Sequence, residues 1–187
     1  LSVNGRKAGE EYLLPGFHAY DYWLQYQTFD VTDLLQSGEN TVSAALGNGW
    51  YKGRFGFQSE VCDWYGDTFQ FLCQLEVTLS DGTRQIICTG EDWACRPGNC
   101  LESSIYDGEF TDGSMELPGL DVFGGEKDGG WTAVKCSGLG MEKLSPRLSP
   151  AITYQEAIPV AEVIHTPAGE TVFDFGQELT GWVEFVC

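Results

Sequence analysis

The sequence is short of basic residues, and this shortage excludes two classes of partner. Its 187 residues include 10 Lys and Arg against 28 Asp and Glu, for a formal net charge of −18. Nucleic acids are bound mainly through clustered Lys and Arg that displace counterions, and the longest basic stretch here is Arg6-Lys7. We therefore expect no nucleic-acid partner. We also expect no membrane partner, because no apolar run approaches the roughly 20 residues that span a bilayer.

Familiar catalytic and metal-binding motifs are missing as well. The chain has no Gly-x-Ser-x-Gly, no phosphate-binding glycine-rich loop and no His-Glu-x-x-His. Its 7 cysteines include no Cys-x-x-Cys, and neither of its 2 histidines lies at zinc-ligand spacing. We expect free thiols of a cytoplasmic protein, although Cys95 and Cys100 are close enough to bridge. The sequence begins at Leu1 without a signal-like segment, so we expect a piece of a longer protein.

What is present favours an all-β chain. The 24 glycines include several Asn-Gly and Asp-Gly pairs among alternating apolar residues, a pattern typical of hairpins. Apolar residues alternate strictly from Phe69 to Leu79, which predicts a strand with one buried face. Asp81-Gly82 then predicts a tight two-residue turn before a return strand over 85–88. The other expected strands are a hairpin over 1–7 about Asn4-Gly5, and 23–29, 41–46, 171–175 and 182–186.

One short helix and three long loops are expected between these strands. Asp30 or Thr32 can cap about a turn and a half of helix, and Gly38 can end it. Turn-rich loops are expected over 47–67, 97–116 and 117–130, and loops of such length are usually functional or dock onto a neighbour. The two prolines of the 145–150 segment predict an extended linker.

Acids and amides embedded among aromatic residues are the candidate ligand-binding groups. Exposed Trp or Tyr rings stack on a sugar, while neighbouring carboxylates and amides bind its hydroxyls. The candidates are Asp21, Asn48, Trp50, Tyr51, Asp107 and Glu109. Other interpretations remain open, since Trp50 and Tyr51 could instead plug a groove on a neighbouring domain, and residues 106–109 could be a plain tight turn with Gly108 at positive φ.

A series of motifs resembles the N-terminal region of bacterial α-L-rhamnosidases of glycoside hydrolase family 78. The resemblance covers the whole chain in order, with Asn48 and Glu178 standing where Asp and Asn are usual in the family. The motifs are Val3-Asn4-Gly5-Arg6, Leu14-Pro15-Gly16, Gln25-Tyr26-Gln27-Thr28-Phe29-Asp30-Val31-Thr32-Asp33-Leu34-Leu35, Gly38-Glu39-Asn40, Leu46-Gly47-Asn48-Gly49-Trp50-Tyr51-Lys52-Gly53, Ile105-Tyr106-Asp107-Gly108-Glu109, Asp174-Phe175-Gly176-Gln177 and Gly181-Trp182.

The resemblance implies a fold and a domain organisation. Residues 1–146 are expected to form a jelly-roll or galactose-binding-like antiparallel β-sandwich with one short helix. Residues 147–187 are expected to hold a linker and the first strands of a second, truncated β-domain, which in the family precedes a catalytic α/α barrel.

The same resemblance implies a function and its alternative. The chain is expected to be a non-catalytic, inactive fragment that supports the missing barrel and helps recognise rhamnose-containing glycans, while two carboxylates of the barrel hydrolyse terminal α-L-rhamnosyl residues with inversion. The alternative is an autonomous rhamnose-binding module. We expect no cofactor, and Ca²⁺ is the one alternative, because a related module in the family depends on calcium.

Overall fold

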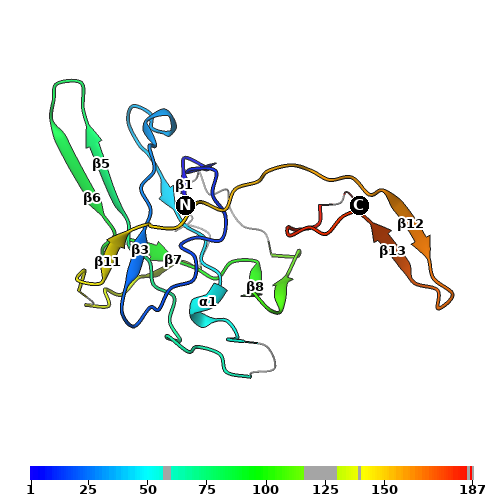
Figure 1. The fold of residues 1–187 in the computed structure, drawn as a ribbon. Helices are drawn as coiled ribbons and strands as arrows, with labels where there is room; N and C mark the ends of the chain where they lie inside the picture. Colours follow the sequence, from blue (N-terminus) through cyan, green and yellow to red (C-terminus); the bar gives the residue numbers. More distant parts are fainter. Residues whose placement is uncertain (57–59, 116–129, 139, 185, 187) are drawn as a thin grey trace. The chain divides into compact units, whose positions relative to one another are not determined.

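The computed structural model describes residues 1–56, 60–115, 130–138, 140–184 and 186 (Figure 1). It divides into two compact units, Leu1–Ile152 and Thr153–Cys187, which are described separately. Short β-strands, mostly in antiparallel pairs, make up nearly all the regular structure, and the described residues contain one α-helix. The expected all-β class with one short helix is confirmed.

The first hairpin forms as predicted and is part of a three-stranded sheet. Strand β1 (Ser2–Val3) pairs with β2 (Arg6–Lys7) on one side and with β4 (Val42–Ser43) on the other, both antiparallel. Asn4 and Gly5 both adopt positive φ, at 49° and 75°, as a two-residue hairpin turn requires. The Asn4 side chain also donates to the Leu34 carbonyl at 2.9 Å and accepts from the Thr41 N–H at 2.9 Å.

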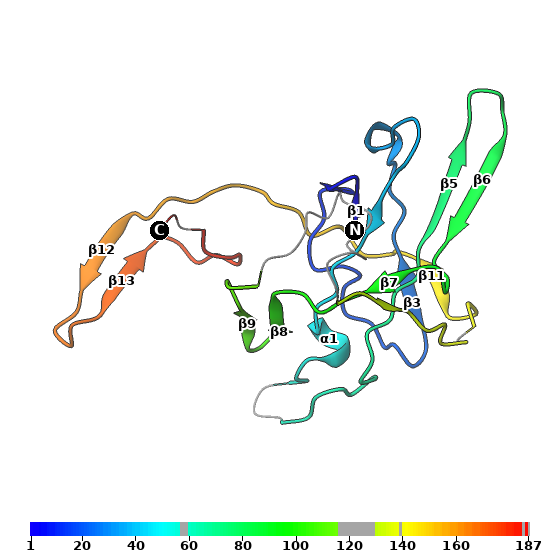
Figure 2. The same cartoon turned by 180° about the vertical axis from the view of Figure 1, so that it is seen from behind.

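The second predicted hairpin also forms, but with a different turn. Strands β5 (Gln74–Thr78) and β6 (Arg84–Cys88) pair antiparallel over their full length (Figures 1 and 2). The predicted two-residue turn is wrong, because Gly82 takes positive φ and Asp81 does not. The Gly82 N–H donates to the Leu79 carbonyl at 2.9 Å, and the Leu79 N–H donates to the Thr83 carbonyl at 2.8 Å. These bonds close a three-residue loop.

Helical structure appears in two places, one of them unexpected. At the predicted site only a 3₁₀ turn forms, η1 (Thr32–Leu34), with the Asp30 carboxylate accepting from the Thr32 N–H at 3.0 Å. It ends at Leu35, whose backbone is extended, and the Asn40 side chain then accepts from the Gln36 N–H at 2.9 Å. The α-helix, α1 (Gly49–Lys52), lies in the 47–67 segment expected to be a loop.

The expected loop over 97–116 contains a hairpin. Strand β8 (Cys100–Ser104) pairs antiparallel with β9 (Gly108–Thr111), with Gly108 at φ 76° as the tight turn predicted. A further short pair joins β7 (Ala94–Cys95) to β10 (Thr132–Ala133). The expected loop over 117–130 lies outside the described residues, apart from Gly130.

The predicted linker is extended but packs on the first unit. Strand β11 (Leu144–Pro146) pairs parallel with β3 (Leu24–Tyr26). Beyond it, the Leu148 N–H donates to the Gln25 side chain at 2.7 Å, and Arg147 forms an ion pair with Glu11. The first compact unit therefore continues to Ile152.

The second unit is built on one hairpin. Strand β12 (Glu162–His165), which the sequence analysis missed, pairs antiparallel with β13 (Thr171–Asp174), which it predicted. The strand predicted over 182–186 is wrong for its described residues, since Trp182, Val183, Glu184 and Val186 lie outside any strand. The signal for β12 in the sequence was the Thr166-Pro167-Ala168-Gly169 turn that joins it to β13, where Gly169 has φ 87°.

Very little of the apolar content is buried. Among the described residues, the buried hydrophobic side chains are Val3 and Ala8, which are 2% and 3% exposed. Both strands of the β12–β13 hairpin are exposed along their whole length. An isolated two-stranded hairpin is marginally stable in water. The exposed strands of this hairpin therefore need further packing partners.

Candidate functional site

Aromatic rings from three segments pack together around α1 in the first unit. Tyr20 lies at the centre, with its ring centroid 4.8 Å from that of Tyr65, 5.4 Å from Tyr51 and 5.4 Å from His18, all edge-on. Edge-to-face pairs of this kind are a favoured aromatic geometry. We call the whole group the aromatic cluster, and its members are Phe17, His18, Tyr20, Trp23, Tyr51, Phe55, Trp64 and Tyr65.

Two polar members of the cluster are perturbed by burial. The Tyr20 hydroxyl donates to the Gly16 carbonyl at 2.7 Å, and burial, reinforced by Tyr65, raises the pKa of Tyr20 to about 12. His18 is 3% exposed, and burial lowers its pKa. Its Nδ1 atom has no hydrogen-bond partner within the described part of the chain. Sequence reasoning missed both residues, and the only signal was the aromatic density of 17–23.

Close backbone approach holds α1 beside the β8–β9 hairpin (Figure 2). Gly49 forms an isolated bridge with Ser104. A side chain on Gly53 would overlap the Gly49 carbonyl and lie 3.2 Å from the Ser104 hydroxyl. The glycines of the Gly47-Asn48-Gly49-Trp50-Tyr51-Lys52-Gly53 motif thus let the helix end pack against a strand.

Two ion pairs tie down the loop that follows α1. Lys52 Nζ lies 3.0 Å from Asp63 Oδ1, and the Asp63 N–H donates to the Lys52 carbonyl at 3.0 Å. Arg54 donates to both carboxylate oxygens of Asp107 at 2.9–3.1 Å, which joins the loop to the β8–β9 turn. Hydrogen bonds from Arg54 lower the pKa of Asp107 below its usual range. A carboxylate held in this way is a poor proton donor near neutral pH.

The six predicted site residues fall on neighbouring elements. Asp21 is exposed in a turn over 19–22, and the ring of the preceding Tyr20 contacts Tyr51 of α1. Asn48, Trp50 and Tyr51 are half-buried on or beside α1, whereas Asp107 and Glu109 are exposed on the adjacent hairpin. The six residues thus lie in the 19–22 turn, on or beside α1, and on the β8–β9 hairpin. Their role in binding stays a prediction.

The described residues lack the features of a metal site and of a membrane span. They contain no group of three or more His, Cys, Asp or Glu side chains placed to hold a metal ion. They also contain no helix long and apolar enough to cross a membrane. Six cysteines of the described residues are free thiols, including Cys95 and Cys100, and burial raises the pKa of the half-buried Cys73.

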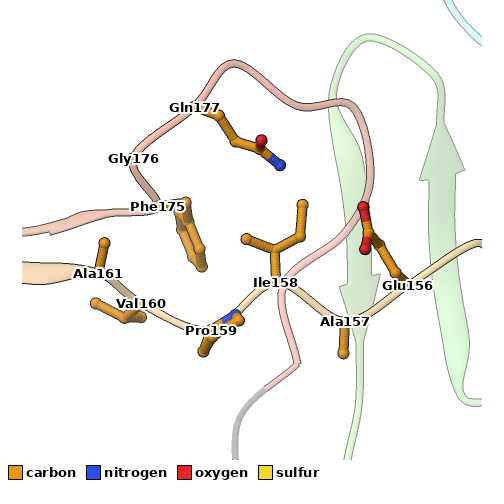
Figure 3. A pocket seen from close by; sticks show the side chains of 9 residues that line it. All are labelled: Glu156, Ala157, Ile158, Pro159, Val160, Ala161, Phe175, Gly176 and Gln177. Atoms are coloured by element: carbon orange, nitrogen blue, oxygen red, sulfur yellow. The ribbon is translucent and has the colours of Figure 1, made fainter.

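The second unit carries an open hollow of about 430 Å³ beside the turn after β13 (Figure 3). The Gly176 N–H donates to the Asp174 carboxylate at 2.7 Å and so shapes this turn. Phe175 and Ile158 supply apolar walls, while Glu156 and Gln177 carry polar groups at the rim. With one carboxylate, this hollow lacks the acid pair of a glycosidase.

Comparisons with known proteins agree over nearly the whole chain. The family model described as alpha-L-rhamnosidase N-terminal domain matches residues 1–156. An α-L-rhamnosidase of Streptomyces avermitilis is 32% identical over 182 residues, which are 97% of this chain and 17% of that protein. One from Formosa agariphila is 31% identical over 185 residues, 97% of this chain and 19% of that protein.

Solved structures show the same likeness. The native α-L-rhamnosidase from Aspergillus terreus superposes with a TM-score of 0.84 at 35% identity, over 97% of this chain and 21% of its own. The Streptomyces avermitilis α-L-rhamnosidase complexed with L-rhamnose gives a TM-score of 0.79 at 30% identity, over 94% of this chain and 17% of its own. The chain therefore spans about a fifth of the length of these relatives.

Proposed function

The chain belongs to the alpha-L-rhamnosidase N-terminal domain family, and from this membership we propose that it is the non-catalytic front part of an α-L-rhamnosidase. In this role it supports a catalytic barrel carried by the remainder of a longer polypeptide, which hydrolyses terminal α-L-rhamnosyl residues of glycans or glycosides. Inversion requires two carboxyl groups about 6.5–9.5 Å apart, one of them a proton donor. We assign both to the barrel.

The observation that carries this proposal is the small core. A chain that is 42% hydrophobic buries two apolar side chains among its described residues, Val3 and Ala8. A stable domain of this size normally buries most of its apolar surface. The relatives are about five times longer, so the part of such a protein outside this region is large enough to cover the exposed strands.

The local chemistry also favours a supporting role over a catalytic one. Two of the acids on or beside the loop after α1, Asp63 and Asp107, are engaged by Lys52 and Arg54. The Asp107 carboxyl stays ionised because its pKa is lowered. A general acid needs the opposite shift.

A turnover assay tests this proposal. This chain alone should not hydrolyse an aryl α-L-rhamnoside, whereas the complete gene product that contains it should. Turnover by the chain alone that disappears in Asp107→Ala or Glu109→Ala would overturn the non-catalytic assignment.

A second candidate is an autonomous rhamnose-binding module. The contact between Tyr20 and Tyr51 supports it, because it brings the turn of Asp21 beside the helix of Asn48 and Trp50. Trp50 would contact the apolar face of the sugar, and Asp21 and Asn48 would bind its hydroxyls. A Ca²⁺ ion there takes six to eight oxygen ligands, so backbone carbonyls or the sugar would have to complete its shell.

Calorimetry with L-rhamnose, with and without calcium, tests the module. Removing one hydroxyl partner through Asp21→Ala should cost about 1–3 kcal/mol of binding free energy, which would abolish a weak interaction. The absence of heat in both conditions would reject the module and leave the supporting role.

A further inference from the structure

Three rings of the aromatic cluster form an exposed row on the surface of the first unit. The centroid of Phe55 lies 6.0 Å from that of Phe17 and 6.0 Å from that of Trp64, with interplanar angles of 30° and 21°. Phe17 is 51% exposed, Phe55 37% and Trp64 59%. We call these three residues the aromatic row. Contiguous exposed rings of this kind mark interaction sites.

The row is held in place from behind. Tyr65 packs edge-on against Phe55 at 6.4 Å and also contacts the central Tyr20 at 4.8 Å. The Phe55 N–H donates to the Val61 carbonyl at 3.0 Å, which joins Phe55 to the segment that leads to Trp64. A surface ordered in advance loses little conformational entropy on binding.

The polar groups beside the row indicate what kind of partner fits. Lys52 and Arg54 are already paired with Asp63 and Asp107, so they are not free to bind sugar hydroxyls. Asp63, which directly precedes Trp64, is likewise engaged by Lys52. Exposed rings whose neighbouring charges are already paired suit an apolar protein surface better than the hydroxyls of a sugar, because few polar groups are left to bind those hydroxyls.

We propose that the aromatic row is the surface by which this chain docks onto the catalytic part of its own polypeptide. This inference rests on the proposed function. The relatives extend far beyond the matched region, and the corresponding remainder of this polypeptide is the proposed docking partner. It also moves the docking role considered for Tyr51 to other rings. The Tyr51 ring is engaged inside the cluster by Tyr20 and Tyr65.

The test compares Trp64→Ala in two settings, the complete gene product and this chain alone. Because Trp64 is 59% exposed here, its removal should change the unfolding of the isolated chain little. In the complete protein it should remove a buried anchor, and thermal inactivation should become about tenfold faster or more. Phe55→Ala should also make thermal inactivation faster, whereas Trp64→Phe should keep most of the wild-type resistance to inactivation. Tyr22→Ala is the matched control, an aromatic residue that is 81% exposed and outside the cluster.

The outcomes separate the two levels of the proposal. A complete gene product without rhamnosidase activity would reject the proposed function itself. An active product in which Trp64→Ala and Phe55→Ala inactivate at the wild-type rate would reject the docking row while the function stands. A raised KM for the rhamnoside with unchanged inactivation would also reject it, and would make the row a sugar contact. Circular dichroism of the variant chains would establish that they fold.

Discussion

Tyr20→Ala should destabilise this chain far more than Tyr22→Ala, although the two tyrosines lie in the same turn. Tyr20 makes three edge-on ring contacts at centroid distances of 4.8 to 5.4 Å and donates one hydrogen bond of 2.7 Å. Tyr22 is 81% exposed and lies outside the cluster. The pair therefore isolates the contribution of the aromatic cluster.

The magnitude follows from these contacts. Each aromatic pair contributes about 0.5–1.5 kcal/mol beyond area burial, and a hydrogen bond of this kind contributes about 1 kcal/mol. Because Tyr20 is half-buried rather than fully buried, we expect a loss of about 3 kcal/mol, near the lower end for aromatic truncation in a core. Tyr20→Phe should lose about 1 kcal/mol. Tyr22→Ala should stay within about 0.5 kcal/mol of wild type.

Urea unfolding followed by circular dichroism measures these differences as shifts of the transition midpoint at constant slope. The expected order of stability is wild type and Tyr22→Ala together, then Tyr20→Phe, then Tyr20→Ala. Equal midpoints for Tyr20→Ala and Tyr22→Ala would refute the cluster as the element that joins the 16–23 segment to α1.

Substitutions at three further positions test other parts of the first unit. Burial lowers the pKa of His18 in the folded chain, so the unfolded chain binds the proton more readily. The free energy of unfolding should therefore fall as pH drops below about 6.5. His18→Leu should remove this part of the acid sensitivity, and a variant with the wild-type pH profile would contradict the prediction. Gly66→Ala places a methyl group on the Tyr51 hydroxyl and should cost about 1–3 kcal/mol by overpacking, so wild-type stability in urea would show that Tyr51 moves freely. Asn4→Ala should cost more than Asn4→Gly in the same assay, because Asn4 has φ 49° and alanine tolerates that backbone poorly; equal losses would mean that only the side-chain hydrogen bonds matter.

Features set by a few adjacent residues were predictable. Asn4-Gly5 specified its turn because both residues tolerate positive φ, and Gly108 did so for the β8–β9 turn. The detail of the 79–83 loop was not predictable, since Asp81-Gly82 suits both a two-residue and a three-residue turn. The strand expected over 182–186 was a similar error, because apolar alternation shows that a strand can form but not that a partner strand is present.

The candidate site was predicted only in part. The sequence pointed to the neighbourhood of Asp21, Trp50 and Asp107, which the structure places on adjacent elements. It could not show that Arg54, 53 residues away, engages Asp107. Among 28 acids, nothing local distinguishes one that is paired from one that is free.

The sequence by itself determined the family, the all-β class and the turns at Asn4-Gly5 and Gly108, because each is encoded in residue order or in the backbone preferences of a few neighbours. The tertiary structure alone decided the burial of His18, the central place of Tyr20 and the exposure of Phe17, Phe55 and Trp64. It also decided that β11 pairs with β3, which lies more than a hundred residues earlier in the sequence. These features depend on which distant segments pack together, and packing is settled by the burial and shape of the whole unit, which local residue patterns do not record.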